Sequence, residues 1–511
     1  MAQGGKFRVL VFIVAYNAEK TIAQVVRRIP ASLLDTYEVD ILIIDDSSRD
    51  ATFDQGHSIS KDESLPFRLT VLFNPVNQGY GGNQKLGYRY AIENGYDFVA
   101  LIHGDGQYAP ECLPELLAPL RNGEASAVFG SRMMTPSGAL RGGMPMYKFV
   151  GNRVLTWIEN KLLRSNLSEF HSGYRLYSTR ALASIPFERN SNAFHFDTEI
   201  IIQLITAKLK IKELPIPTYY GDEICYVNGM KYAKDVVIAV IKARLQDAGL
   251  FYDRKFDCAA PDDSPYKPKL TYDSPHTYAF ERVRAGSRVL DIGCAGGYMA
   301  ADLVNRKQCI VDGLDAFVAI EPTLNSFHLH DLNTGLPELE YEKYDYVLML
   351  DVIEHLAKPE IFLDGLRHAL GSNPRAEIII STANIGFIIP RLMLLIGQFN
   401  YGRRGILDMT HTRLFTFKSF ERVVSQSGFD ILERKGVPGP FPMALGDNFF
   451  SRFLLNVNKF LIHLSRGMFS YQIMLRIKPQ PTLEWLLTTA VEHSKQRVES
   501  IEGHETNLAR R

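Results

Sequence analysis

The sequence lacks an apolar run of the length that a membrane-spanning helix needs, which is about 18 residues. The nearest candidate, Ile385 to Gly397, is interrupted by Pro390 and Arg391. Near the start of the chain, Val9 to Val14 is apolar but too short for the core of a secretion signal, and it predicts a buried strand instead. We therefore expect a chain that does not cross a membrane.

The sequence is also poor in cysteine and has no excess of either charge. Its five cysteines form no Cys-x-x-Cys pair, so neither a zinc site nor a disulfide framework is expected, and a reducing cytoplasm fits. The 57 Lys and Arg residues balance 57 Asp and Glu residues, whereas nucleic-acid-binding proteins usually carry a basic excess. We expect a cytoplasmic location, with peripheral contact at the inner face of the membrane left open, and no nucleic-acid partner.

Short apolar runs alternate with helical patterns in both halves of the chain, which is typical of α/β domains. Between the halves, residues 256–272 are rich in proline and aspartate and have no periodicity. The predicted domains are therefore 7–255 and 273–480, joined by a linker over 256–272 and followed by a charged helical tail over 481–511. Each domain should contain a largely parallel sheet, in which ligands collect at the carboxyl ends of the strands.

In the first half, a polar motif follows each of four predicted strands. The four motifs are, in chain order, Val14-Ala15-Tyr16-Asn17, Asp45-Asp46-Ser47-Ser48, Asn77-Gln78-Gly79-Tyr80-Gly81-Gly82 and His103-Gly104-Asp105-Gly106-Gln107. A nucleotide diphosphate-sugar needs a carboxylate for its base and glycines that let the backbone approach its ribose and phosphates. It also needs a carboxylate that holds a divalent cation, which neutralises the diphosphate leaving group.

This series resembles the family 2 glycosyltransferases with the GT-A fold, and among them the dolichyl- and polyprenyl-phosphate sugar transferases. The resemblance implies nucleoside contacts from Ala15, Asn17 and Asp46. It implies a floor of the site built from Asn77, Gly79 and Gly82, with Ser131 and Arg132 facing the phosphates. It implies a Mg²⁺ or Mn²⁺ ion on Asp105, with Gln107 and His103 beside it, and catalytic acids at Asp197 and Glu199 that follow Ser172-Gly173-Tyr174-Arg175.

One residue departs from the pattern of that family. Its metal motif is often Asp-x-Asp, and here His103 replaces the first acid; because histidine suits Mn²⁺ better than Mg²⁺, the choice of metal is open. Structural alternatives also stand, since Asp45-Asp46 can form a turn with a helix cap, and Asp197 and Glu199 can be solvated acids of a first helical turn. Inverting transfer to a phosphate acceptor, already an anion, would need little general base.

The second half contains a strand followed by a glycine-rich turn, Val289-Leu290-Asp291-Ile292-Gly293-Cys294-Ala295-Gly296-Gly297. The acid stands before the glycines, as in Asp-x-Gly-x-x-x-Gly, and Asp315 closes the next strand, where a ribose diol would lie. Asp331 follows before the third strand, and Asp351-Val352-Ile353-Glu354-His355 follows the strand Tyr346–Leu350.

These motifs resemble the class I S-adenosylmethionine-dependent methyltransferases, and within them the small-molecule O-methyltransferases of quinone biosynthesis and their relatives. The resemblance implies that Asp291, Gly293 and Gly296 pack against the methionine part of the cofactor, with Asp315 at its ribose and Asp331 at its adenine. Glu354 and His355 would support a metal or a general base, and His411 is a second candidate base, because an imidazole titrates near neutrality. Bracing of the helix by Glu354-His355, packing of His411 and a turn cap at Asp331 are the structural alternatives.

Residues 449–464 are strongly apolar with interspersed cations, which fits an interfacial amphipathic helix or a core helix packed on the second sheet. The core helix is the favoured interpretation. Residues 385–395 are a candidate lid or second contact.

The predicted fold class is α/β with two domains, an N-terminal GT-A domain with a Rossmann-like mixed sheet and a C-terminal Rossmann-like class I methyltransferase domain. The predicted function is that of a bifunctional transferase of cell-envelope glycan biosynthesis. It would move a sugar from a nucleotide-sugar, UDP preferred, to a polyprenyl-phosphate or glycan acceptor, and would methylate a hydroxyl with S-adenosylmethionine. Two alternatives remain: a first half that binds the nucleotide-sugar or glycan without transferring it, and a second half that only senses the cofactor.

Overall fold

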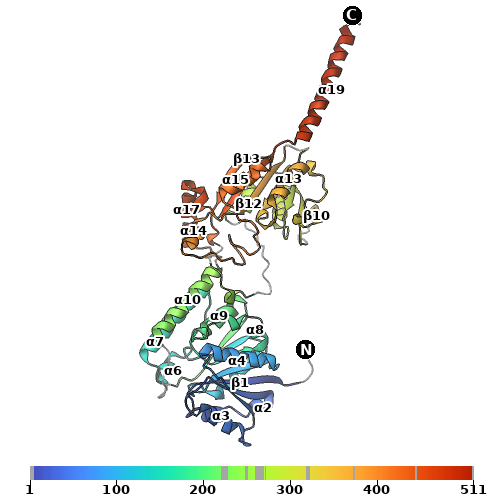
Figure 1. Cartoon of the computed structure of the whole chain (residues 1–511). Helices are drawn as coiled ribbons and strands as arrows, with labels where there is room; N and C mark the ends of the chain where they lie inside the picture. Colours follow the sequence, from blue (N-terminus) through green and yellow to red (C-terminus); the bar gives the residue numbers. More distant parts are fainter. Residues whose placement is uncertain are drawn as a thin grey trace. The chain divides into compact units, whose positions relative to one another are not determined.

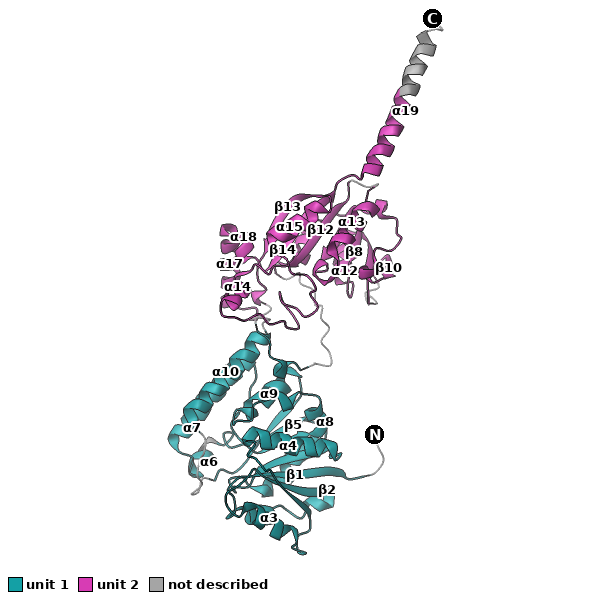
Figure 2. Ribbon diagram, viewed as in Figure 1, with its two compact units in different colours: residues 1–247, 251–263 teal, residues 248–250, 264–511 magenta. Residues whose placement is uncertain are grey.

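The structure is a computed structural model, and it describes residues 5–219, 228–247, 251–258, 270, 272–317, 323–371, 375–442 and 446–508. Most of the predicted linker, residues 259–269 and 271, lies outside the described residues. The chain separates into two compact units, one of residues 1–247 and 251–263 and the other of residues 248–250 and 264–511 (Figure 2). Among the helices that the structure describes, none combines the length and apolar character of a membrane-spanning segment.

The first unit contains a seven-stranded mixed sheet with strand order β3-β2-β1-β4-β6-β5-β7. Figure 1 draws this unit in blue to green. Its strands are β1 Phe7–Ala15, β2 Tyr37–Asp45, β3 Arg68–Phe73, β4 Phe98–His103, β5 Ala127–Ser131, β6 Arg175–Ser178 and β7 Ile211–Pro215. Its helices are α1 Ile22–Arg27, α2 Leu33–Thr36, α3 Thr52–Ser60, α4 Tyr80–Glu93, α5 Leu113–Arg121, α6 Pro136–Arg141, α7 Met146–Leu163, α8 Thr179–Ala183, α9 Phe196–Thr206 and α10 Gly229–Asp247. The sheet is mixed because β6 runs antiparallel to both β4 and β5, while β3, β2, β1 and β4 are mutually parallel.

Both faces of the first sheet are covered, as the continuous apolar strands require. The buried residues of one face join α1, α3 and α5 to the sheet, and those of the other face join α4, α8 and α9 to it. Helix α4 can approach β1 closely because residue 87 is glycine: a Cβ there would lie 2.1 Å from Cε1 of Phe12.

The second unit repeats this architecture with strand order β10-β9-β8-β11-β12-β14-β13. Its strands are β8 Arg288–Ile292, β9 Ile310–Asp315, β10 Ser326–Leu329, β11 Tyr346–Leu350, β12 Glu377–Ala383, β13 Phe429–Val437 and β14 Gln472–Pro479. Its helices are α11 Pro275–Arg282, α12 Tyr298–Lys307, α13 Pro359–Ala369, α14 Ile388–Leu395, α15 Phe417–Gln426, α17 Phe449–Leu464, α18 Arg466–Phe469 and α19 Leu483–Leu508. Helices α13 and α15 cover one face and α11 and α12 the other, while the antiparallel strand β14 separates β12 from β13.

The favoured interpretation of residues 449–464 as a core helix is wrong. Helix α17 turns Phe449, Phe450, Phe453 and Phe460 to the outside and buries a narrower face that includes Ser451 and Asn458. The sequence could not reveal this orientation, because an apolar stripe packs equally well against a sheet or against an external surface.

The tight contact at Gly87 gives a testable expectation about the first unit. The substitution Gly87→Ala should lower its free energy of unfolding by about 1–3 kcal/mol, because the added methyl group overpacks the contact with Phe12. The matched control is Gly151→Ala on α7, where an added Cβ meets no described atom within 4 Å. The control should be neutral or stabilising by up to about 1 kcal/mol. Denaturant unfolding followed by circular dichroism measures both, and equal effects would contradict the close approach.

Candidate functional site

In the first unit, the parallel strands carry the predicted site motifs to one edge of the sheet. Residue Val14 of β1 pairs with Ile44 of β2 on one side and with His103 of β4 on the other, and Ile44 pairs with Leu72 of β3. The segments that follow these four residues therefore emerge side by side. The strand order reverses at β1, because β2 and β3 lie on one side of it and β4 lies on the other. In such a sheet a ligand site is expected at the carboxyl ends of the strands beside this point.

The segments after β1 and β2 are cross-linked by hydrogen bonds at this edge. The carbonyl of Ala15 accepts from the backbone N–H of Asp46 at 2.9 Å, and the Oγ of Ser48 accepts from the N–H of Asn17 at 2.8 Å. Asn17 has a φ of 51°, and its Oδ1 accepts from the N–H of Arg49 at 3.0 Å. The side chain of Asn17 thus shapes the loop itself, and its contact with a nucleoside stays a prediction.

The carboxylate of Asp46 organises the next loop. Its Oδ1 accepts from Asn74 Nδ2 and from the N–H of Gln78, both at 2.8 Å, and its Oδ2 accepts from the N–H of Gly79 at 2.9 Å. Asn77 Nδ2 donates to the carbonyl of Asp46 at 2.8 Å, so the predicted floor of the site is fastened to this residue. Gly79 is required by its φ of 78° and by a Cβ position only 2.7 Å from the carbonyl oxygen of Asn192. At Gly82 a Cβ would lie 2.9 Å from the Cβ of Gln78.

The neighbouring Asp45 is a candidate that sequence reasoning passed over. Its Oδ1 accepts from the N–H of Ser48 at 2.9 Å, but its buried Oδ2 has no hydrogen-bond partner among the residues that the structure describes. A buried carboxylate oxygen without a donor is costly, so it marks a place where a ligand N–H fits. Its position as the last residue of β2 was the available signal, because such positions face the edge where ligands bind.

A chain of hydrogen bonds fixes the protonation of His103. Tyr80 Oη donates to Asp197 Oδ2 at 2.9 Å, and His103 Nε2 lies 3.0 Å from the same Oη. Burial raises the pKa of Tyr80 well above its usual value, so its single proton stays and is given to the carboxylate. His103 must therefore donate from Nε2. Burial also lowers the pKa of His103, so the ring is neutral at pH 7 and its Nδ1 carries a free lone pair.

That lone pair lies beside Asp105, the one carboxylate of the predicted metal motif. His103 Nδ1 is 3.9 Å from Asp105 Oδ2, and the Asp105 side chain is 41% exposed, whereas its Oδ1 accepts from the N–H of Gln107 at 3.0 Å. Within the described ranges no group of three or more His, Cys, Asp or Glu side chains could hold a metal ion. One imidazole nitrogen and one carboxylate fit a divalent cation whose other ligands come from a diphosphate, and this donor set favours Mn²⁺ over Mg²⁺.

The two predicted catalytic acids of α9 are enclosed rather than solvated. Asp197 Oδ1 accepts from Gln84 Nε2 at 3.1 Å and lies 3.7 Å from Nε of the buried Arg175. Glu199 accepts from the N–H of Ser191 at 2.6 Å and from Lys255 Nζ at 2.5 Å. The alternative of solvated helix acids is therefore wrong for both. Asp197 reaches His103 through Tyr80, while Glu199 anchors the segment at Ser191.

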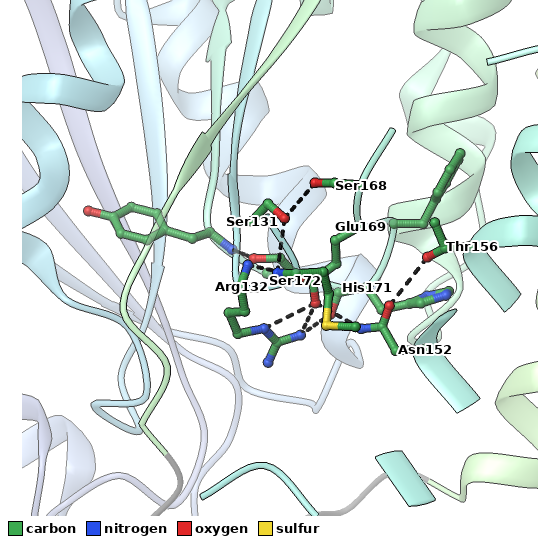
Figure 3. Close-up of polar contacts among 12 residues, drawn as sticks. Ser131, Arg132, Asn152, Thr156, Ser168, Glu169, His171 and Ser172 are labelled. Carbon is green, nitrogen blue, oxygen red and sulfur yellow. Dashed lines mark hydrogen bonds and ion pairs between the residues drawn. The ribbon is translucent and has the colours of Figure 1, made fainter. Parts of the chain in front are cut away.

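The predicted phosphate ligand Arg132 is held by a buried carboxylate (Figure 3). Glu169, 2% exposed, accepts from the backbone N–H of Arg132 at 2.7 Å and from its Nε at 3.1 Å, and it also pairs with Nη2. Asn152 of α7 donates to the same carboxylate at 2.9 Å, and Ser131 Oγ lies 2.7 Å from Ser168 Oγ. The guanidinium charge is thus largely compensated inside the unit, and its contact with phosphates stays a prediction.

In the second unit, the predicted cofactor residues also meet at the carboxyl edge of a parallel sheet. Asp291 is buried near the end of β8, and its Oδ2 has no hydrogen-bond partner within the described part of the chain. Burial, and then the charge of Asp315, raise the pKa of Asp291 to about 7. Gly293 has a φ of 74°, and a Cβ there would lie 2.3 Å from Cγ2 of Val352, while a Cβ at Gly296 would lie 2.7 Å from the ring of Tyr298.

Asp315 closes β9 and bridges the glycine-rich turn. Its Oδ2 accepts from the N–H of Ala295 at 2.7 Å and its Oδ1 from the N–H of Phe317 at 2.9 Å. Asp331 lies two residues beyond Leu329, the strand partner of Asp315, and its exposed carboxylate accepts from the N–H of Asn333 at 2.9 Å. A buried oxygen without a donor at Asp291 and a cradle of glycines beside it fit a cationic, extended cofactor such as S-adenosylmethionine.

Three further predicted residues follow β11 and β12. Glu354 is buried, its Oε1 accepts from the N–H of Ala383 at 3.1 Å, and burial followed by the charge of Asp351 raises its pKa. His355 and His411 face each other with ring centroids 4.9 Å apart. The Nδ1 of His355 lies 3.2 Å from the carbonyl of Thr410, and that of His411 lies 3.0 Å from the carbonyl of Ile406.

Because a carbonyl oxygen only accepts, both histidines must carry their proton on Nδ1. This leaves the Nε2 of each ring able to take a proton from an acceptor. Burial lowers the pKa of His411, which keeps that ring neutral near pH 7. The pair His355–His411 therefore has the chemistry of a general base. Glu354 holds the strand end through Oε1, but its buried Oε2 has no hydrogen-bond partner among the described residues, so its part in catalysis or metal binding stays a prediction.

Comparison with known proteins divides the chain in the same way. Residues 10–185 match the family described as Glycosyl transferase family 2, and residues 268–434 match a family described as Methyltransferase domain. A UDP-N-acetylglucosamine–dolichyl-phosphate N-acetylglucosaminyltransferase of Methanococcus voltae is 28% identical over 42% of this chain and 86% of its own length. A ubiquinone biosynthesis O-methyltransferase of Neisseria meningitidis is 26% identical over 30% of this chain and 67% of its own length.

Among solved structures, glucosyl-3-phosphoglycerate synthase from Mycobacterium tuberculosis, in complex with Mn²⁺, uridine diphosphate and phosphoglyceric acid, is similar at 17% identity. The similarity covers 51% of this chain and 81% of that chain, with a TM-score of 0.37.

The raised pKa of Asp291 gives an expected pH dependence. Between the pKa of an unfolded aspartate, about 4, and the folded value, the folded unit retains a proton that the unfolded chain releases, so stability falls as pH rises. Asp291→Asn removes this cost. The free energy of unfolding of the variant minus that of the wild type should therefore increase by about 2–3 kcal/mol between about pH 5 and about pH 8.

Denaturant unfolding of the ligand-free chain at both pH values measures this gain. The control Asp302→Asn, on the surface of α12, should change stability by less than about 0.5 kcal/mol at either pH. A gain at Asp291→Asn that does not depend on pH would contradict the assignment.

Proposed function

Since the chain joins a family 2 glycosyltransferase domain to a methyltransferase domain, we propose that it transfers a sugar from a nucleotide-sugar to a polyprenyl phosphate and also methylates a hydroxyl group. The observation that carries the first activity is the convergence of Asp45, His103 and Asp105 at one sheet edge. The name of the Methanococcus voltae relative, an enzyme of UDP-N-acetylglucosamine and dolichyl phosphate, supports this donor and acceptor class.

The donor is a UDP-sugar, and Asp45 reads its base. The unpartnered Oδ2 of Asp45 accepts the imino N–H of uracil, while Asp46 holds the loop 74–79 in place beneath it. Asp105 and His103 Nδ1 would hold a divalent cation, with Gln107 beside them. This cation would neutralise the departing nucleotide diphosphate.

The acceptor supplies its own nucleophile. A phosphate monoester is an anion at neutral pH and attacks the anomeric carbon with inversion, so the site needs positioning more than a general base. This agrees with the enclosure of Asp197, which we assign to positioning of Tyr80 and His103. Helix α7 presents Tyr147, Val150, Val154 and Trp157 as an exposed apolar stripe, which suits a polyprenyl chain or the bilayer that holds it.

For methylation, the residues of the second unit bind and orient two partners. Asp291, Gly293, Gly296 and Asp315 form the seat of S-adenosylmethionine, with Asp331 at the adenine end. The cofactor would supply an electrophilic methyl group. The Nε2 of one ring in the pair His355–His411 takes the single proton of the acceptor hydroxyl, and that hydroxyl belongs to the sugar or its lipid-linked product.

The decisive assay offers UDP-, GDP- and dTDP-sugars with Mn²⁺ or Mg²⁺ and a short polyprenyl phosphate, with and without S-adenosylmethionine, and detects the products by mass spectrometry. A sugar-lipid that gains the mass of one methyl group when S-adenosylmethionine is present supports both activities. Binding of nucleotide-sugar without release of nucleotide diphosphate, from any pairing, would favour a first unit that only binds its ligand.

Removal of the exposed carboxylate separates the two activities. Asp105→Ala should reduce sugar transfer by about 10²–10³-fold, because a charge-stabilising group of the transition state is lost. Binding of S-adenosylmethionine, measured by calorimetry, should not change. Glu115→Ala, which removes an exposed carboxylate on α5, is the matched control and should retain sugar transfer. Equal transfer by both variants would contradict the role of Asp105.

The hydrogen-bond chain to His103 gives an expectation about metal affinity. Tyr80→Phe removes the oxygen that fixes the tautomer and orientation of His103, so binding of Mn²⁺ in the presence of UDP should weaken by about 10–100-fold. Electron paramagnetic resonance titration of free Mn²⁺ measures this directly. Tyr90→Phe on the same helix is the control and should bind Mn²⁺ as the wild type does. Unchanged affinity in Tyr80→Phe would remove His103 from the metal site.

A further inference from the structure

The second unit carries an apolar surface that the proposed chemistry does not use. Helix α17 exposes Phe449, Phe450, Phe453, Val457, Phe460 and Leu464, with exposed fractions from 38% to 88%. Their spacing places them on one face of the helix, and the stripe from residue 449 to 464 is about 22 Å long. Exposed aromatic side chains on this scale mark an interaction surface.

The helix cannot turn this stripe inward. Its buried face is Ser451, Leu455, Asn458 and Ile462, and the two polar members are committed to hydrogen bonds. Ser451 Oγ donates to the carbonyl of Gly446 at 2.7 Å, and Asn458 accepts from the N–H of Gly439 at 2.9 Å and donates to the carbonyl of Phe469 at 2.9 Å. These hydrogen bonds hold the face with Ser451 and Asn458 against the unit, so the more apolar face points outward. In a core helix the more apolar face would be the buried one.

Helix α14 extends this surface. It exposes Leu392, Leu394 and Leu395, followed by Ile396. Asn384, just before α14, donates to the carbonyls of Gly467 at 3.2 Å and Ser470 at 2.8 Å, so the start of α14 is fastened to α18, which packs on α17. Figure 2 shows α14, α17 and α18 at one end of the unit.

The charge of these segments selects the partner. Residues 385–411 contain three arginines and one aspartate, and residues 446–466 contain three basic residues and one aspartate. Arg452 pairs with Asp447 and Lys459 pairs with Asp273, and with Asp273 included the two segments still carry six positive and three negative charges. Cations interspersed with a single aromatic stripe are typical of helices that lie in the interface of a membrane with anionic lipids, where headgroups attract the cations and the acyl chains take up the side chains.

From this geometry we propose that the α14–α17 surface docks the second unit on an anionic lipid bilayer. The proposal deepens the proposed function, because it makes the methyl acceptor a lipid-linked molecule. Ile406 packs against Phe387 beside α14, and the carbonyl of Ile406 holds Nδ1 of His411. A docked α14 thereby brings the proposed base pair His355–His411 to the lipid surface, where the acceptor headgroup lies.

The test is flotation of the full chain with vesicles of phosphatidylcholine alone or mixed equally with phosphatidylglycerol. The proteins carry Val154→Ser and Trp157→Ser, so that the stripe on α7 does not mask the result. Adding Phe453→Ser and Phe460→Ser should reduce binding to the anionic vesicles at least about tenfold. The matched control adds Ile361→Ser and Leu483→Ser, which remove apolar side chains of α13 and α19 that are at least as exposed as Phe453, and it should bind as the parent does.

Folding of each variant is checked by calorimetric binding of S-adenosylmethionine, which none of these substitutions touches. Equal flotation of the test and control proteins overturns the proposal. So does absence of binding to either vesicle, or a dimer seen by light scattering that the Phe453→Ser and Phe460→Ser pair dissociates, since a second copy would then be the occupant. Sugar transfer is assayed separately with a short polyprenyl phosphate in solution, and its failure would count against the proposed function and not against this surface.

Discussion

The buried carboxylate of Asp197 is the point on which the first site depends. It accepts hydrogen bonds from Tyr80 and Gln84 of α4 and lies beside Arg175 of β6, so it holds the helix and the strand to α9. Removing a buried carboxylate from such partners would leave an uncompensated arginine inside the unit, which is costly. The same carboxylate takes the only proton of Tyr80 and thereby decides which nitrogen of His103 is free. The hydrogen bond between Tyr80 and Asp197 therefore contributes both to the stability of the first unit and to the choice of the free nitrogen of His103.

The second unit differs from the first in how its central buried carboxylate is paired. There the central carboxylate, Asp291, has no donor in the described part of the chain and carries a raised pKa, so the ligand-free unit holds an unfavourable group at the sheet edge. Such a cost persists in a fold when a cation in the functional state relieves it. In the first unit the buried Asp197 is paired with Arg175, while Asp45 keeps one unpartnered oxygen and Asp105 is exposed; in the second unit the buried Asp291 keeps an unpartnered oxygen at the sheet edge.

The sequence predicted which residues lie at the carboxyl ends of the strands. It predicted little about which side chains form hydrogen bonds with one another. Parallel strands had to bring Asp46, His103, Asp291 and Asp315 to their carboxyl ends, so these positions followed from apolar runs alone, whereas the unpartnered oxygen of Asp45 did not. The sequence could not show that Asp46 holds the loop 74–79, because all four donors to its oxygens are backbone N–H groups or side chains that lie 28 to 33 residues further along the chain. The tautomer of His103 depends on Asp197, more than ninety residues away, and no local pattern reports it.

In α17 the few polar side chains determine which face of the helix is buried. Hydrogen bonds of Ser451 and Asn458 determine the inward face, and the phenylalanines take the outward one. If both units act on a lipid-linked substrate, confinement to a surface raises the concentration of each intermediate at the next site without any contact between the units. The fusion would bring together two reactions that share a surface, with no need for a channel between their sites.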